Sequence, residues 1–379
     1  MKKFLIAFLA SASGLFLSNS AMATTNYMAV VDGGSTGSRL YLYTYDPDST
    51  NTLKLPTLIN SAKVQPGIAT LDPSQIATYL APLFQMVQKD IPSGISANLY
   101  FLSTAGMRLL SFDQQQAIYS VINTSATKAG LTPVVSKTIT GQMEGVFDWI
   151  NINALLNTLG QPQGQTSGVL DLGGASTEIS FAGNGNNINP DDLVTLSLAN
   201  QTYTLYSHSY LGLGENEAQG QYMNAAECYP VDYNLPNEHT GTGDFHACQS
   251  HVASLLDPVQ NVKNIQSLIP TNTNMPFYAT SGFAYITTSK IFNLGSQLST
   301  QSLKTAAINS CAQTWDLLNQ EDPSDPYLYA TCFDAALAIN LLNSYGFSPN
   351  QILTATNAIG NTDIDWALGA AIYYLNPQG

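Results

Sequence analysis

Two short glycine loops of nearly the same spelling constrain the fold of this chain more than any other feature. The first, DGGSTGS at residues 32–38, follows an apolar run at 27–31, and the second, DLGGAST at 171–177, follows GVL at 168–170. Apolar residues resume after each loop, so each unit is expected to be a β-hairpin with a tight glycine turn. Glycine lets backbone N–H groups approach an anion, and Ser or Thr hydroxyls can hold phosphate oxygens. Two such loops in one chain predict two related lobes that clamp one phosphate chain.

Each loop begins with an aspartate, Asp32 or Asp171, at the end of its strand. A carboxylate in that position can orient a divalent cation or the waters bound to it. One glycine hairpin alone is more often an ordinary turn. The repetition of the loop, with the aspartate kept, favours the functional interpretation.

The first residues predict export. Two lysines, a short apolar run at 4–16 and the tripeptide AMA at 21–23 form the pattern of a secretory signal peptide, residues 1–23, cut after Ala23. The run is shorter than the ~20 residues that a membrane-spanning helix needs, and we expect no membrane anchor elsewhere. The sequence therefore predicts a secreted or periplasmic protein.

Length and charge set further bounds. The 379-residue chain is longer than the roughly 250–300 residues that one hydrophobic core serves, so two lobes are expected. We place lobe I at 24–160, lobe II at 161–359 with a polar linker at its start, and a helix at about 360–379 that returns to lobe I. The net charge of −14 argues against a nucleic-acid partner, which needs a basic face. An anionic substrate then requires local positive groups and a metal.

The even number of cysteines in a chain expected to be exported predicts two disulfides. Three pairings are possible, and the expected one joins sequence neighbours, which closes the shortest loops: Cys228–Cys248 and Cys311–Cys332. The alternative is a zinc site, because three histidines lie near the first two cysteines. Their spacing matches no common zinc pattern. These histidines are His239, His246 and His251.

Three further segments carry candidate charged groups. Arg39 follows the first loop and either points back at the phosphates or is a solvated strand residue; both interpretations stay open. An apolar strand ends in STAGMR at 103–108, and a strand end that leads into a helix suits an anion, with Arg108 as the cation. Glu144 lies in a predicted turn before a helix at about 146–159. By itself, such a glutamate is typical of a helix's first turn.

In this order, these segments resemble the ecto-nucleoside triphosphate diphosphohydrolase (apyrase) family. The matches are 32–39, TAGMR at 104–108, TGQMEG at 140–145 with Trp149, and 171–177, with weaker ones at 209–212, 277–283 and 365–369. They extend from about residue 29 to 372. The resemblance implies an α/β fold of two actin-like (ribonuclease-H-like) lobes, each with a mixed sheet flanked by helices, and an active site in the cleft between them.

The resemblance also implies an activity: hydrolysis of the terminal phosphates of nucleoside tri- and diphosphates with Mg²⁺ or Ca²⁺ and without a phosphoenzyme. Glu144 corresponds to the general base that activates the attacking water. Thr104 and Ser176 match residues that position the water or the terminal phosphate, and Arg108 matches a cation near that phosphate. The family's metal-holding carboxylates match Asp32 and Asp171. The candidate phosphate-binding residues are Gly34, Ser35, Thr36, Gly37, Ser38 and Arg39 in the first loop, and Gly173, Gly174 and Ala175 in the second.

The chain departs from the family at Glu178, where the second loop usually continues with Gln. A glutamine can donate to and accept from the attacking water, whereas an ionised glutamate only accepts. Beside Glu144 it could raise the pKa of one carboxyl, which would alter the pH optimum or substrate preference, or it could bind the metal; the sequence leaves these open. The family stacks the nucleobase on aromatic rings. The available rings are Phe283, Tyr285, Tyr327 and Tyr329.

Three rival functions remain at this stage. An exported exopolyphosphatase would also use paired glycine loops with a glutamate between them. A sugar or acetate kinase of the same superfold would need external ATP as donor, and a nucleotide-binding module without turnover would conflict with an intact Glu144. We expect a monomer that acts on ATP, ADP, GTP, GDP or similar nucleotides.

Overall fold

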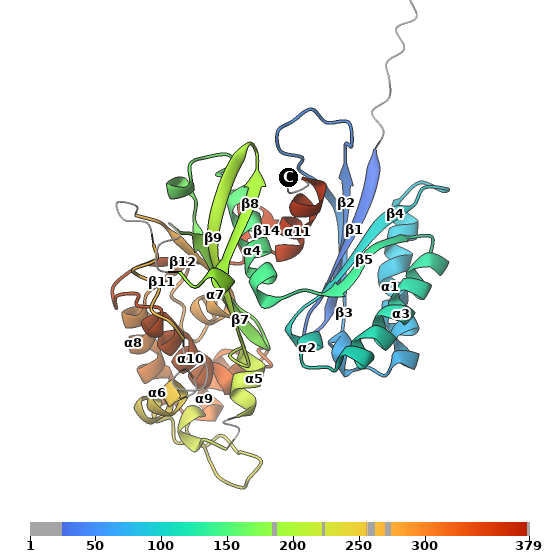
Figure 1. Cartoon of the computed structure of the whole chain (residues 1–379). Helices are drawn as coiled ribbons and strands as arrows, with labels where there is room; N and C mark the ends of the chain where they lie inside the picture. The colour runs from blue at the N-terminus through green and yellow to red at the C-terminus, as the bar shows by residue number, and fades with distance from the viewer. Residues whose placement is uncertain are drawn as a thin grey trace, which may run out of the picture.

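The computed structural model describes residues 25–183, 188–221, 224–254, 256, 262–269 and 274–376. The expected signal peptide lies outside these residues. The described chain forms two mixed β-sheets flanked by helices (Figure 1). No helix in these ranges is long and apolar enough to cross a membrane.

The first sheet contains the first glycine loop and has the strand order β3-β2-β1-β4-β5. Strands β1 to β3 pair antiparallel, whereas β1–β4 and β4–β5 pair parallel. The expected hairpin is present, with Asp32 opposite Arg39 across β1 and β2. The strands are β1 (Asn26–Gly33), β2 (Ser38–Tyr45), β3 (Thr57–Val64), β4 (Ala97–Ser103) and β5 (Thr132–Thr138).

Alternation along β1 divides its side chains between two cores. Ala29 and Val31 pack with helices α1 (Pro73–Asp90) and α3 (Phe112–Lys128) on one face of the sheet. Met28 and Val30 belong to the larger core on the other face. This is the two-residue period of a strand buried on both sides.

The second sheet contains the second loop and has the order β11-β12-β10-β6-β7-β9-β8. The second expected hairpin is β6–β7, antiparallel, with Asp171 opposite Glu178. Strand β10 pairs parallel with β6 and β12. The strands are β6 (Gly168–Leu172), β7 (Ser176–Ala182), β8 (Leu193–Leu198), β9 (Gln201–Leu211), β10 (Phe277–Ser281), β11 (Gln297–Leu298) and β12 (Leu353–Ala355). A small separate pair is β13 (Ala358–Ile359) and β14 (Thr362–Asp363).

Two helices lie between the sheets. Helix α4 (Gly141–Leu155) packs on β6, β7 and β9, and α11 (Trp366–Leu375) packs on both α4 and β1 (Figure 1). The division of the chain into lobes at 160–167 stays a prediction. The remaining helices are α2 (Ala105–Arg108), α5 (Glu215–Gly220), α6 (Phe245–Ser254), α7 (Gly282–Thr288), α8 (Thr300–Cys311), α9 (Trp315–Glu321) and α10 (Thr331–Ser344), with 3-10 turns η1 (Ile68–Thr70), η2 (Gln163–Gln165), η3 (Pro190–Asp192), η4 (Ala226–Cys228) and η6 (Leu328–Ala330).

Helix α4 begins earlier than the sequence predicts, which corrects the position of Glu144. The Thr140 hydroxyl accepts a hydrogen bond from the Met143 N–H and caps the helix, so Glu144 lies in its first turn rather than in a turn before it. The helix also ends early, because Asn157 adopts φ +56°, a left-handed conformation typical of a helix end.

Both expected disulfides are present. Cys228–Cys248 joins η4 to α6, and Cys311–Cys332 joins the end of α8 to the start of α10. With all four sulfurs bonded in pairs, the rival zinc site has no cysteine ligand.

Candidate active site

A cavity of about 880 Å³ lies where the two glycine loops meet. Its wall is formed by both loops, the starts of α2, α4, α5 and α7, and the segment before α10. A Cβ atom on Gly174 of the second loop would come within 2.9 Å of Ser35 Oγ of the first. The predicted site residues that line the cavity are Asp32, Gly34, Ser35, Thr36, Gly37, Arg39, Thr104, Glu144, Asp171, Gly173, Gly174, Ala175, Ser176, Tyr285 and Tyr327.

The tips of the loops present free backbone donors. Within the described part of the chain, the N–H groups of Ser35, Thr36, Gly174 and Ala175 make no hydrogen bond. Consecutive unpaired N–H groups form a concavity suited to an anion. The loops can therefore bind phosphate oxygens without losing hydrogen bonds of their own.

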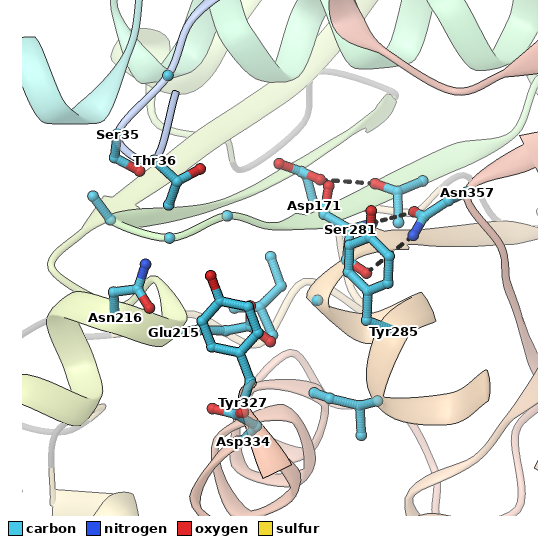
Figure 2. Close-up of a pocket in the computed structure, with 18 of the residues that line it drawn as sticks. Ser35, Thr36, Asp171, Glu215, Asn216, Ser281, Tyr285, Tyr327, Asp334 and Asn357 are labelled. Atoms are coloured by element: carbon cyan, nitrogen blue, oxygen red, sulfur yellow. Dashed lines mark hydrogen bonds between the residues drawn. The ribbon is translucent and has the colours of Figure 1, made fainter. Parts of the chain in front are cut away.

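The two leading aspartates lie at the strand ends, where Asp171 is buried and Asp32 is half-buried. Burial raises the pKa of Asp32 well above its usual range, and Asp365, Glu144 and Asp171 raise it further while Arg39 lowers it. Burial also raises the pKa of Asp171, against hydrogen bonds from Ser281 and Thr280 that lower it. Thr280 Oγ1 donates to Asp171 Oδ1 at 2.9 Å (Figure 2), whereas Asp32 Oδ1 is buried without a hydrogen-bond partner in the described residues. A buried carboxylate oxygen without a donor suits a cation.

Glu144 lines the cavity but is almost completely buried, because only 6% of its surface is accessible. Burial raises its pKa to about 7, and the opposing effect of Arg108 keeps it from rising further. Arg108 Nη2 forms an ion pair with Glu144 Oε2, and its Nε donates to the Ile139 carbonyl at 3.0 Å. A carboxyl with a pKa close to neutrality is suited to general-base catalysis.

Arg108 itself does not line the cavity. Its guanidinium lies between Glu144 and Glu178, with Nη1 3.8 Å from Glu178 Oε1. This position favours orientation of Glu144 over the direct phosphate contact that the resemblance implies.

Glu178 lies behind the cavity wall. Its Oε1 accepts hydrogen bonds from Ser176 Oγ and Ser209 Oγ, both at 2.6 Å. Burial raises its pKa well above the usual range, with Glu144 and Asp171 adding to the effect. Because it contacts Ser176 and does not reach the cavity, the interpretation of Glu178 as a metal ligand gains no support.

Of the four candidate rings, two face the cavity. Tyr285 and Tyr327 are 67% and 58% exposed, and Figure 2 shows both beside the pocket. Phe283 is fully buried in the core, so its expected role in base stacking is wrong. Tyr329 stacks on Tyr233 with 5.9 Å between ring centroids and does not line the cavity, which corrects that expectation too. Residues two apart in a helical turn point in nearly opposite directions, which explains the split between 283 and 285.

Ser38 and Arg39, at the end of the first loop, lie in different surroundings. Ser38 is fully buried and does not line the cavity, so the predicted phosphate contact of its side chain is not possible. Arg39 lines the cavity, but its Nη1 donates to Tyr41 OH at 3.0 Å and lies 3.5 Å from Asp365 Oδ2. Arg39 therefore lines the cavity, as the phosphate interpretation expects, while Asp365, the N-cap of α11, binds its guanidinium. Both interpretations of Arg39 stay open.

Several cavity residues were missed from the sequence. Asp148 lies one helical turn after Glu144 on α4, a spacing that could have revealed it. Ser281 adopts φ +53°, held by Asn357 Oδ1, which accepts from its N–H at 2.6 Å (Figure 2); such strain is often found at functional sites. Glu215 and Asp334 had no recognisable signal, because only tertiary packing brings them to the wall.

The chain matches the GDA1/CD39 (nucleoside phosphatase) family over residues 19–378. It is 28% identical to a protein described as probable apyrase 6 of Arabidopsis thaliana, over 94% of this chain and 74% of that one. It is also 28% identical to ectonucleoside triphosphate diphosphohydrolase 3 of Homo sapiens, over 92% of this chain and 78% of that one.

Solved structures show the same fold. A nucleoside triphosphate hydrolase from Neospora caninum superposes with a TM-score of 0.66 at 15% identity, covering 93% of this chain and 92% of that one. An exopolyphosphatase-like protein gives 0.56 at 12% identity, covering 92% and 98%. The expected α/β fold of actin-like type is confirmed. Together with the family match, this establishes that the chain belongs to the GDA1/CD39 (nucleoside phosphatase) family.

Proposed function

We propose that this protein hydrolyses the terminal phosphates of nucleoside triphosphates and diphosphates, assisted by a divalent cation. The observation that carries the proposal is a buried Glu144 that faces a cavity rimmed by two phosphate-binding loops. The names of the curated relatives support nucleotides as the substrates. The two disulfides support an exported protein.

Asp32 and Asp171 are the residues that would hold the cation. Both carboxylates line the cavity, one from each hairpin, and Asp32 Oδ1 is buried without a donor. In the described residues no group of three or more His, Cys, Asp or Glu side chains is arranged as a metal cage. A hard cation such as Mg²⁺ or Ca²⁺ that keeps most of its waters fits two carboxylates. Such a cation would neutralise charge on the phosphate oxygens.

Glu144 acts as the base in this proposal. Water attacks the terminal phosphorus directly, its proton passes to Glu144, and the phosphoanhydride bond breaks to release inorganic phosphate and a nucleotide one phosphate shorter. Because Ser176 Oγ donates its own proton to Glu178, its lone pairs are left to accept from the water and orient it. Proton transfer of this kind contributes roughly 10²–10⁴-fold to rate, and loop N–H groups aimed at developing charge contribute further.

The nucleobase is placed between Tyr285 and Tyr327 in this proposal. Both rings line the end of the cavity away from the first loop (Figure 2). Stacking on exposed rings tolerates different bases, since every base has a π face.

Phosphate release from ATP, ADP and polyphosphate tests the proposal. We expect release from both nucleotides with Mg²⁺ or Ca²⁺, none with EDTA, and a fall in kcat of about 10²–10⁴-fold in Glu144→Gln. The variant should still bind nucleotide. Release from polyphosphate alone would favour an exopolyphosphatase, and full activity in a folded Glu144→Gln protein would reject the assignment of the base.

A further inference from the structure

We propose that Glu215 recognises the ribose of the nucleotide by accepting hydrogen bonds from its vicinal hydroxyls, so that the enzyme selects ribonucleotides. This inference rests on the proposed function, because it assumes that the two loops hold nucleotide phosphates. Three features of Glu215 support the inference: the hydrogen bonds of its backbone, the contact of its carboxyl with α7, and the absence of a hydrogen-bond partner for that carboxyl in the described residues.

The backbone of Glu215 is fastened to the second phosphate loop. Its N–H donates to the Gly173 carbonyl at 2.9 Å, and the next N–H, of Asn216, donates to the Gly174 carbonyl at 2.9 Å. The preceding residue, Gly214, lies so close that a Cβ there would be 2.3 Å from Ala175 N. The start of α5 is therefore a fixed extension of the loop that holds phosphate.

The carboxyl of Glu215 reaches from that loop to the helix that carries the base-stacking ring. A Cβ on Gly282, the first residue of α7, would lie 2.4 Å from Glu215 Oε1, so the carboxyl packs against the backbone there. Tyr285 follows three residues later on the same helix. Glu215 thus connects the phosphate loop with the helix that carries one of the rings, and it is among the cavity-lining residues labelled in Figure 2. In a nucleotide, the group between phosphate and base is the ribose.

The carboxyl also lacks a partner. It lines the cavity, and no hydrogen bond or ion pair from the described residues reaches it. Burial raises the pKa of Glu215 well above its usual range, with Asp334 and Asp171 adding to the effect, so the group repels phosphates less than an exposed carboxylate would. A carboxyl oxygen accepts hydrogen bonds in either protonation state. Ribose hydroxyls are donors that can satisfy it, and carboxylates are used in this way in dinucleotide-binding folds.

The test compares ATP with 2′,3′-dideoxy-ATP, which lacks both hydroxyls. In the unaltered enzyme we expect kcat/KM to be about 10-fold or more higher for ATP, the size of a hydrogen bond to a charged or buried group. In Glu215→Ala the ratio of kcat/KM for ATP to kcat/KM for 2′,3′-dideoxy-ATP should fall towards about 1. The fall should come from a lower kcat/KM for ATP, with the value for the dideoxy nucleotide unchanged. Glu215→Gln keeps the shape and an accepting oxygen, and should keep part of the ratio.

Tyr285→Ala is the matched control, because it should weaken both nucleotides alike and leave the ratio unchanged. Equal losses on both nucleotides in Glu215→Ala, or no discrimination by the unaltered enzyme, would overturn the inference. Calorimetric binding of the two nucleotides to Glu144→Gln separates this result from the proposed function. Ribose-dependent binding to Glu144→Gln, together with no phosphate release by the unaltered enzyme, would overturn the hydrolase proposal and leave the role of Glu215 supported.

Discussion

Two opposing effects determine the pKa of a single residue, Glu144. Burial disfavours its charged form and Arg108 favours it, and the balance leaves its pKa at about 7. Asp171 and Asp365 add negative charge nearby and push in the same direction as burial. The group is therefore able to change protonation state near the pH at which a hydrolase works.

The pH profile should report this balance. A base must be ionised, so kcat/KM is expected to fall about tenfold per pH unit below about pH 7 as Glu144 becomes protonated. Arg108→Ala removes the charge that lowers the pKa, and its acidic limb should move to higher pH. Arg108→Lys keeps a charge and should shift the limb less.

The three profiles are compared on one substrate, so ionisation of the nucleotide itself is common to all. An acidic limb that stays in place in Arg108→Ala would show that the arginine does not set the protonation of Glu144.

At the level of elements, helices α4 and α11 determine where the catalytic carboxyl lies. A Cβ on Gly369 would be 1.9 Å from the Phe147 carbonyl oxygen, so the two helices meet backbone to backbone. Asn151 Nδ2 of α4 also donates to the Asp365 carbonyl at 2.6 Å, at the start of α11. This close crossing fixes α4, and with it Glu144, against the C-terminal helix.

Gly369→Ala should separate these helices. We expect a loss of stability of about 1–3 kcal/mol or more from overpacking, measured as a lower midpoint in urea unfolding, together with reduced kcat. Gly220→Ala is the control, because no atom of the described residues outside its own helix and chain neighbours lies within 4 Å of a Cβ there. A Gly369→Ala protein as stable as this control would contradict the close crossing.

Much of the element structure could be predicted because its signals are local. Helix α1 begins at Pro73, because Asp72 and Gln75 form a capping box whose residue types are recognisable in the sequence. The orientation of the side chains was harder to predict from the sequence. Ser38 and Phe283 face inward, and Glu215 faces the cavity, because of packing between segments far apart in sequence. Local pattern identifies a loop, but tertiary contacts decide which of its side chains face the ligand.

At the scale of the whole molecule, the two disulfides connect η4 to α6 and α8 to α10. Cys228–Cys248 closes a loop with a sequence separation of 20 and fastens the described part of the 228–248 segment to α6. Replacement of both cysteines by alanine should lower stability by about 3 kcal/mol, measured by chemical unfolding. Because neither residue lines the cavity, KM for ATP should stay unchanged in the folded protein; a large change in KM would show that this segment shapes the site.

The packing of α11 on β1 has a consequence for how the chain folds. Tyr41 of β2 donates a hydrogen bond to Asp365 at the start of α11, and the two residues lie 324 positions apart. Contacts between segments so distant in sequence form only after a costly loop closure, which slows folding. We therefore expect the cover that α11 gives to the first sheet to form late in folding.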